Sequence, residues 1–381
     1  MERIYLDYAA STPVDPEVER AMRPYLGKRF GNPGSIHSFG QEAMAAVDKA
    51  RETFAKILNA EFREIIFVSS ATEGNNLAIR GTIKKSGIQD PRIITSQIEH
   101  ESVLETCRDL KKDGAEIIEL PVSQDGFLDL NQLKKTLNER TVLVSIIYAS
   151  NEIGVIEPIR EIAEIIADFK KKNSCQYPLF HTDAAQAFQF LEMDVKSLGV
   201  DLMTVSSQKI YGPKGASLLY ARENTLVPVI TGGIQEFGLR AGTENVPAIV
   251  GFETAALLVQ KNKTSEAKRI GKLRDYFWKE LKKKKPELRV NGDMHNRLVN
   301  NLNVYFPKDR AEDLIIKFDL AGVAVSHGSA CAGRKSEPSH AVLALGFGKE
   351  RAERSLRLTL GTPMTKRQID KAAKRIINLV Q

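Results

Sequence analysis

Short apolar runs alternate with longer amphipathic stretches over the first part of the chain. The runs are rich in Ile, Val, Leu and Phe, and their lengths are typical of strands. Between most of them lie stretches of helical periodicity, such as 41–58 and 159–172. Continuously apolar strands that alternate with helices predict an α/β protein with a mostly parallel, seven-stranded sheet covered on both faces. The predicted strands are Glu64–Ser70, Arg92–Ser96, Ala115–Leu120, Thr141–Ala149, Tyr177–Ala185, Asp201–Ser207 and Ala216–Ala221.

A long helical stretch over 247–285 ends this alternation. The segments after it, "LVNNLNVYF", "DLIIKFDLAGVAVS" and a final helix, are typical of a smaller α+β domain. A chain of 381 residues exceeds the size at which a single core stops growing, so two domains are expected. We predict a large domain over 15–262 and a small domain built from 1–14 and 263–381, which carries the loop around Cys331.

The composition and the net charge of the chain argue against some classes of binding partner. The net charge is +7, and lysine runs at 170–172 and 282–285 contribute to it. Solvated helix ends explain these runs better than a nucleic-acid surface, because no recognition motif or interleaved aromatic residues accompany them. No apolar run approaches the roughly 18 residues that span a bilayer, and the N-terminus lacks the apolar core of a signal peptide. We therefore expect a cytoplasmic protein that binds neither membrane nor nucleic acid.

The three cysteines are far apart and form no C-x-x-C motif. This spacing predicts neither a disulfide framework nor a zinc site, and we expect no metal. Cys107 falls on a helical pattern and Cys175 in a polar loop, which suggests structural or incidental roles. Cys331 lies in "VSHGSACAGRKSEPSH", a polar and basic segment. Neighbouring His, Arg and Lys side chains favour the thiolate, so Cys331 is the candidate reactive thiol.

Polar residues follow the predicted strands, where ligands bind in open parallel sheets. The stretch Ser69–Ile79 reads as a strand end and helix start that could hold a phosphate, or as an ordinary N-cap. Asp183 lies in an apolar strand, as a structural ion pair or as a carboxylate facing a cationic ring nitrogen. Lys209 follows the next strand and is either a surface lysine or one that forms a Schiff base. Together these features predict pyridoxal 5′-phosphate (PLP), which uses all three groups.

The motifs along the whole chain resemble one known family. They run from "YLDYAASTPVDPEV" through "FGNPGSIHSFG", "SSATEGNNLAIRG", "HTDAAQ", "KIYGPKG" and "RAGTEN" to "GSACAG" and "SLRLTLG". The sequence is similar to the cysteine desulfurases of the class V aminotransferase group, of the NifS/IscS-like group I branch. The resemblance implies the PLP-dependent transferase fold of type I. It also implies a homodimer that converts L-cysteine to L-alanine and passes the sulfur, through a persulfide on Cys331, to an iron–sulfur scaffold or a tRNA-thiolation carrier.

The resemblance also implies roles for individual residues. Lys209 would hold PLP covalently, His100 would stack on the ring and transfer protons, and Cys331 would accept the sulfur. Asp183 would pair with the ring nitrogen and Gln186 with the phenolic oxygen. The residues implied at the phosphate are Ala71, Thr72, Ser206, Gln208 and, from the partner subunit, Thr243. Those implied at the substrate carboxylate are Asn151 and Arg357.

Two features depart from the family pattern. Gln208 stands where the family has a histidine before the lysine, and a glutamine amide donates hydrogen bonds but carries no charge. The chain ends soon after its last helix, where group I members often continue with a tail that contacts the scaffold protein. The alternatives are a selenocysteine lyase or another class V aminotransferase-type enzyme, a non-catalytic PLP-binding module, and a basic RNA-binding protein.

Overall fold

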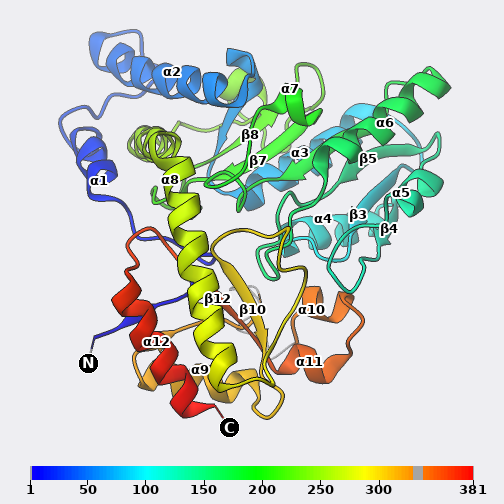
Figure 1. Cartoon of the computed structure of the whole chain (residues 1–381). Helices are drawn as coiled ribbons and strands as arrows, with labels where there is room; N and C mark the ends of the chain where they lie inside the picture. Colours follow the sequence, from blue (N-terminus) through cyan, green and yellow to red (C-terminus); the bar gives the residue numbers. More distant parts are fainter. Residues whose placement is uncertain (1, 329–337, 381) are drawn as a thin grey trace.

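A seven-stranded sheet forms the centre of the larger part of the molecule (Figure 1). The computed structural model describes residues 2–328 and 338–380. The strand order is β2-β8-β7-β6-β5-β3-β4, in which β8 runs antiparallel to both of its neighbours and the remaining pairs are parallel. The predicted mostly parallel sheet is therefore confirmed. Its strands are β2 (Ile65–Val68), β3 (Arg92–Ser96), β4 (Glu116–Leu120), β5 (Thr141–Ser145), β6 (Leu179–Asp183), β7 (Leu202–Ser206) and β8 (Ser217–Ala221).

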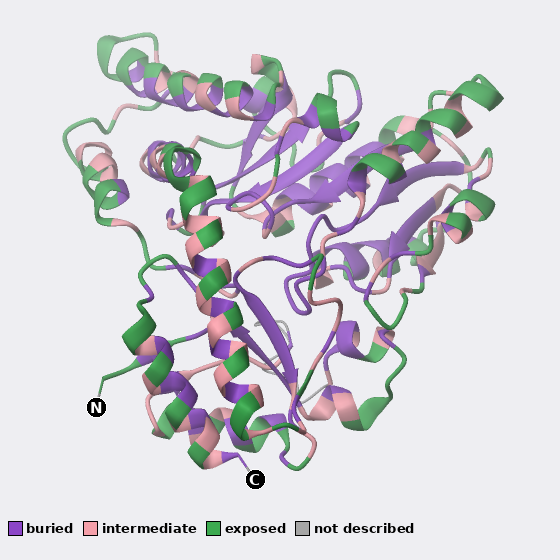
Figure 2. Ribbon diagram, viewed as in Figure 1, coloured by how far each residue is buried: buried purple, intermediate pink, exposed green. Residues whose placement is uncertain are grey.

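Helices cover both faces of this sheet, and strand residues alternate between two apolar clusters. Phe67 belongs to the cluster that includes residues of α2, α6 and α8, whereas its neighbours Ile66 and Val68 belong to the cluster that includes residues of α3 and α4. This period of two is what a strand buried on both faces requires. Figure 2 shows the strands buried and the outer sides of the helices exposed. The helices of this part are α1 (Pro16–Met22), α2 (Ser38–Leu58), α3 (Ala71–Ser86), α4 (Glu101–Lys112), α5 (Leu130–Thr136), α6 (Ile159–Asn173), α7 (Val195–Leu198) and α8 (Val246–Lys284).

The C-terminal part has a second core around a small antiparallel sheet of order β12-β10-β9. The long helix α8 and the last helix pack against each other beside this sheet (Figure 1). The N-terminal strand β1 pairs in parallel with β11, so both ends of the chain lie in this part. The elements are β1 (Ile4–Tyr5), β9 (Arg289–Val290), β10 (Asn301–Tyr305), α9 (Ala311–Leu320), β11 (Val323–Ala324), α10 (His340–Ala344), α11 (Lys349–Glu353), β12 (Ser355–Thr359) and α12 (Lys366–Leu379).

Some boundaries differ from those expected from sequence. The strand predicted over Thr141–Ala149 ends at Ser145, although the backbone N–H groups of Ile146 and Tyr148 still donate to carbonyl groups of β6. The backbone N–H of Ile147 donates instead to the carboxylate of Glu99, at 2.8 Å. In the described part of the chain, no helix is both long and apolar enough to cross a membrane.

Candidate active site

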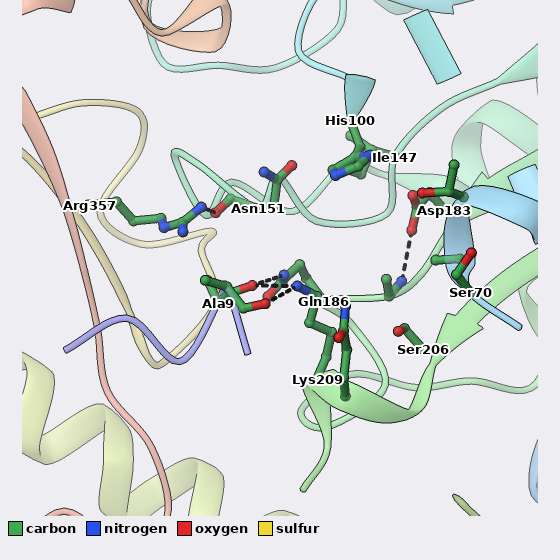
Figure 3. A pocket seen from close by; sticks show the side chains of 15 residues that line it. Ala9, Ser70, His100, Ile147, Asn151, Asp183, Gln186, Ser206, Lys209 and Arg357 are labelled. Carbon is green, nitrogen blue, oxygen red and sulfur yellow. Dashed lines mark hydrogen bonds between the residues drawn. The ribbon is translucent and has the colours of Figure 1, made fainter. Parts of the chain in front are cut away.

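A cavity of about 150 Å³ lies at the carboxyl ends of the parallel strands. Figure 3 shows that side chains from several elements enclose it, with His100 across the cavity from Lys209. Arg357 and Asn151 lie at the end of the cavity opposite Asp183 in this view. Its lining residues are Ala9, Ala10, Ser70, Ala71, Thr72, His100, Ile147, Asn151, Asp183, Ala185, Gln186, Ser206, Gln208, Lys209 and Arg357.

Lys209 enters this cavity directly after strand β7. A single turn of 3₁₀ helix, Ser207–Lys209, follows the strand and carries the side chain round to the cavity. Its Nζ donates to the backbone carbonyl oxygens of Ala9 and Ala10, at 2.8 and 2.7 Å. Lys209 is therefore a partly buried lysine with a fixed position at the strand ends, rather than a surface lysine.

Asp183 is the last residue of β6 and is buried. Its Oδ1 accepts from the backbone N–H of Ala185 at 2.9 Å, and its Oδ2 accepts from Asn75 Nδ2 at 2.8 Å. These partners are neutral donors, and no Lys or Arg among residues 2–328 and 338–380 forms a salt bridge with Asp183. A buried carboxylate held by neutral donors at a cavity wall suits a cationic group inside the cavity.

His100 is the N-cap residue of α4, and its Nδ1 accepts from the backbone N–H of Ser102 at 3.1 Å. Burial lowers the pKa of His100 below its usual value, while the nearby Asp183 carboxylate raises it and the Lys209 ammonium lowers it. Because burial is the largest of these effects, the imidazole is held towards its neutral form. A neutral imidazole can pack on an aromatic ring without a desolvated charge.

Helix α3 begins at the cavity and offers groups that suit a phosphate. Ser70 is its N-cap residue, with Oγ accepting from the backbone N–H of Glu73 at 3.1 Å. Ala71 and Thr72 follow in the first turn and also line the cavity, as does Ser206 from the end of β7. A 16-residue helix that starts beside two hydroxyl side chains favours an anion there. The two interpretations of this motif, N-cap and phosphate site, are compatible.

Arg357 reaches the cavity from β12 of the small sheet and is almost fully buried. Its guanidinium donates to Asp7 Oδ1 at 2.8 Å and to the backbone carbonyl of Asn151 at 3.0 Å. Its Nε is buried with no hydrogen-bond partner among the described residues. A fixed guanidinium with a spare donor is a fitting site for a carboxylate ligand.

Thr243, which is predicted to act at the site of a partner subunit, does not line this cavity. Thr243 is exposed and lines a different cavity, together with Ser69 and Arg240. Cys331 lies outside the described residues. Of the other cysteines, Cys107 is buried in α4, and burial raises the pKa of its thiol to about 12. Cys175 is partly exposed, and its thiol donates to the backbone carbonyl of Tyr177.

The sequence analysis missed several residues that complete the cavity. Asp7 and the carbonyl groups of Ala9 and Ala10 come from the N-terminal segment, where the motif "YLDYAAS" was the available signal. Gln186 Nε2 donates to the Ala9 carbonyl at 2.9 Å, so the N-terminal segment contacts two predicted site residues. Asn75 was also missed, although it lies in the quoted motif "SSATEGNN".

Glu99 gives a testable pH dependence next to this site. It is fully buried, and burial raises the pKa of its carboxyl group to about 8. Between about 4.5 and 8 the folded protein therefore keeps a proton that the unfolded chain releases, so this group destabilises the fold as pH rises. We expect Glu99→Gln to become progressively more stable relative to wild type over that range, as measured by thermal unfolding midpoints. A difference that stays constant with pH would contradict this assignment.

The donor set of the cavity fits PLP. It combines a lysine amine, a buried carboxylate held by neutral donors, a neutral imidazole, and hydroxyl groups at a helix N-terminus. These are the groups that PLP enzymes use for the aldehyde, the ring nitrogen, the ring face and the phosphate. The cavity therefore fits PLP in its chemistry and in its position in the sheet.

Comparison with known proteins identifies the family to which this chain belongs. The model for "Aminotransferase class-V" matches residues 4–372. A cysteine desulfurase IscS from Dictyoglomus turgidum is 45% identical, with 96% of this chain and 92% of the relative covered. A putative cysteine desulfurase IscS 1 from Bacillus subtilis is 42% identical, with 100% of this chain and 99% of the relative covered.

Solved structures agree with these relatives. A NifS-like protein superposes with a TM-score of 0.91 at 34% identity, covering 99% of both chains. A structure described as SspA in complex with cysteine gives a TM-score of 0.80 at 34% identity, covering 93% of this chain and 98% of the other. The sequence, the fold and the cavity thus lead to one assignment: the chain belongs to the class-V aminotransferase family of PLP-dependent enzymes and, within it, to the cysteine desulfurases.

Proposed function

We propose that this protein converts L-cysteine to L-alanine and takes the sulfur onto Cys331 as a persulfide. The observation that carries the proposal is the convergence of Lys209, Asp183, His100 and Arg357 on one cavity, in a chain of the cysteine desulfurase family. The overall step balances, because the substrate thiol sulfur leaves carbon and bonds to the enzyme thiol. L-cysteine and the Cys331 thiol give L-alanine and the Cys331 persulfide.

Named residues would hold the cofactor in this scheme. Lys209 would bind it covalently, Asp183 would face its ring nitrogen and Gln186 its phenolic oxygen. The phosphate would lie at the start of α3, held by Ala71, Thr72, Ser206, Gln208 and, from a second subunit, Thr243. When bound, PLP supplies an electron-withdrawing ring that stabilises negative charge at the substrate α-carbon.

The protein's own groups would then bind the substrate and move its protons. Arg357 would bind the substrate carboxylate together with the Asn151 side chain, and the bond from Arg357 to Asp7 would keep the guanidinium in place. Lys209 Nζ, which lies in the cavity on the side opposite His100 (Figure 3), would take the proton from the substrate α-carbon. His100 would pack on the cofactor ring and transfer protons at Nε2, the ring nitrogen that does not contact Ser102.

The assembly and the partners are part of the proposal. We propose a homodimer in the cytoplasm that passes its persulfide sulfur to an acceptor protein, an iron–sulfur scaffold or a tRNA-thiolation carrier. Exposed apolar side chains support a subunit interface, since Phe30, Ile36 and Ile234 are 71%, 93% and 89% exposed. We also propose the domain division at 262/263, which falls within α8.

One assay tests the activity. Purified protein is incubated with PLP, L-cysteine and dithiothreitol, and both sulfide and alanine are measured. The dithiol is needed because it reduces the persulfide, which releases sulfide and returns the enzyme thiol. We expect equal amounts of the two products. Selenocysteine, or alanine with a keto acid, as the preferred substrate would instead indicate a lyase or an aminotransferase.

Gln208 gives a prediction at the phosphate end of the cavity. Histidine at this position can carry a positive charge, whereas the glutamine amide cannot. We expect Gln208→His to bind PLP as tightly as wild type or up to about tenfold more tightly, as one added charge-assisted hydrogen bond allows. Fluorescence titration of cofactor-free protein with PLP measures this affinity. A clear loss of affinity would mean that Gln208 has a separate role.

A further inference from the structure

Asn75 is a buried polar residue of α3 to which the proposed function gives no role. Its side chain is fully buried, and its Nδ2 lies 2.8 Å from Asp183 Oδ2 and 2.8 Å from Ser102 Oγ. One amide group therefore contacts both the carboxylate at the end of β6 and the hydroxyl at the start of α4. Asp183 and the neighbourhood of His100 are joined through it.

The orientation of the Asn75 amide follows from its partners. An ionised carboxylate only accepts hydrogen bonds, so the NH₂ side must face Asp183. This orientation leaves Asn75 Oδ1 buried with no hydrogen-bond partner among the described residues. A buried acceptor without a hydrogen bond is destabilising, so stability by itself would not favour this arrangement. This loss of stability indicates that the two N–H donors of Asn75 serve a function.

Ser102 extends this contact to His100. Its Oγ receives a hydrogen from Asn75, which leaves its own O–H to donate to His100 Nδ1, at 2.8 Å. The backbone N–H of Ser102 also donates to Nδ1, at 3.1 Å. With two donors directed at Nδ1, the neutral imidazole must carry its proton on Nε2.

We infer that Asn75 is a positioning residue that couples Asp183 to His100, fixing the carboxylate with one N–H and the imidazole tautomer, through Ser102, with the other. The inference rests on the proposed function for its consequence, because these are the groups placed at the ring nitrogen and the ring face. Asn75 thereby links Asp183, at the end of β6, to His100, in the segment that follows β3. A change in the position or charge of the Asp183 carboxylate or of the His100 imidazole then affects the other group through the Asn75 side chain.

Loss of this contact is expected to raise the pKa of His100. Hydrogen bonds to Nδ1 favour the neutral ring, so removing one raises the pKa of His100. Burial and the charge of Lys209 would continue to lower this pKa in every variant. The charges that raise it are those of Asp183, Glu101 and Glu152.

The test uses ¹⁵N-histidine-labelled protein, with and without PLP. Asn75→Leu removes both donors at similar size, and Ser102→Ala removes only the hydroxyl. Thr82→Val is the matched control, because Thr82 is buried on the same helix and its hydroxyl has no partner among the described residues. We expect the His100 Nδ1 resonance to shift, and its titration to move to higher pH, in the first two variants and not in the control.

Combining the variants separates positioning from a general loss of structure. In the Ser102→Ala background, Asn75→Leu should cause little further change at His100, because Asn75 acts there through the hydroxyl. It should still alter the visible absorption of bound PLP through Asp183. We expect kcat of Asn75→Leu to fall about tenfold, as one lost charge-assisted bond implies, with KM changed less than about threefold. Ser102→Thr, which restores a hydroxyl, should recover the His100 resonance.

The outcomes are distinguishable from failure of the proposed function. Unchanged His100 resonances in both Asn75→Leu and Ser102→Ala would overturn the coupling, whatever the enzyme's substrate. Unchanged absorption of bound PLP in Asn75→Leu would overturn the link to Asp183. If Asn75→Leu does not fold, Ser102→Ala still decides the contact to His100. A wild-type protein that releases no sulfide but shows the expected shifts would sink the desulfurase activity and leave the coupling intact.

Discussion

Replacing Lys209 by alanine is expected to abolish turnover and covalent PLP binding together. In the proposed function the amine is the covalent attachment point and the base at the substrate α-carbon, and loss of a positioned base costs about 10²- to 10⁴-fold by itself. We expect sulfide and alanine production from L-cysteine to fall by at least that factor. Borohydride treatment followed by peptide mapping should fix the cofactor to Lys209 in wild type and to no lysine in the variant.

Lys214→Ala is the matched control for this experiment. Lys214 lies in the same turn, after the Gly-Pro pair, but its side chain is exposed. We expect this variant to keep both activity and the covalent adduct at Lys209. Cofactor fixed to another lysine in wild type, or normal turnover by Lys209→Ala, would contradict the assignment of Lys209.

Replacing Cys331 by serine is expected to stop sulfur transfer without loss of PLP. A hydroxyl does not accept sulfur, so sulfide release should fall by roughly 10³-fold or more, as for loss of a catalytic nucleophile. The absorption of bound cofactor should remain, because the residues that hold it are intact. Alkylation and mass spectrometry after addition of L-cysteine should find a persulfide on Cys331 in wild type only.

Cys175→Ser provides the comparison, because Cys175 is the partly exposed thiol among the described residues and serine preserves a donor to the Tyr177 carbonyl. This variant should retain both persulfide formation and sulfide release. Normal turnover by Cys331→Ser would refute the proposed acceptor. Loss of PLP from Cys331→Ser would show that the substitution acts on the cofactor site instead.

The site residues that lie at strand ends could be predicted from the sequence. Asp183 and Lys209 are next to apolar runs that can be recognised as strands, and parallel strands bring their carboxyl ends to one edge. Their meeting in one cavity therefore follows from local patterns and the rules of parallel sheets. The seven strands could be predicted for a similar reason. Continuous apolar runs that alternate with amphipathic helices indicate the buried strands of a parallel sheet.

The residues contributed by the small sheet and the N-terminus could not be derived in this way. Arg357 lies on β12, and only its resemblance to a family motif suggested that it reaches the cavity. The roles of Asp7, Ala9 and Ala10 depend on pairing across the whole chain, which leaves no periodic signal in the sequence. Asn75 looks like an ordinary polar helix residue until Asp183 and Ser102 are placed beside it.

The pairing of β1 with β11 has a consequence for how the enzyme is made. Ile4 is synthesised more than three hundred residues before its partner Val323. At about 5–20 residues per second, the N-terminal strand waits roughly 15–60 s on the ribosome before its neighbour exists. The carbonyl groups that hold Lys209 Nζ follow this strand directly. The nascent chain therefore cannot pair β1 before β11 has been made, and the segment that carries these carbonyl groups is secured by this pairing only from then on.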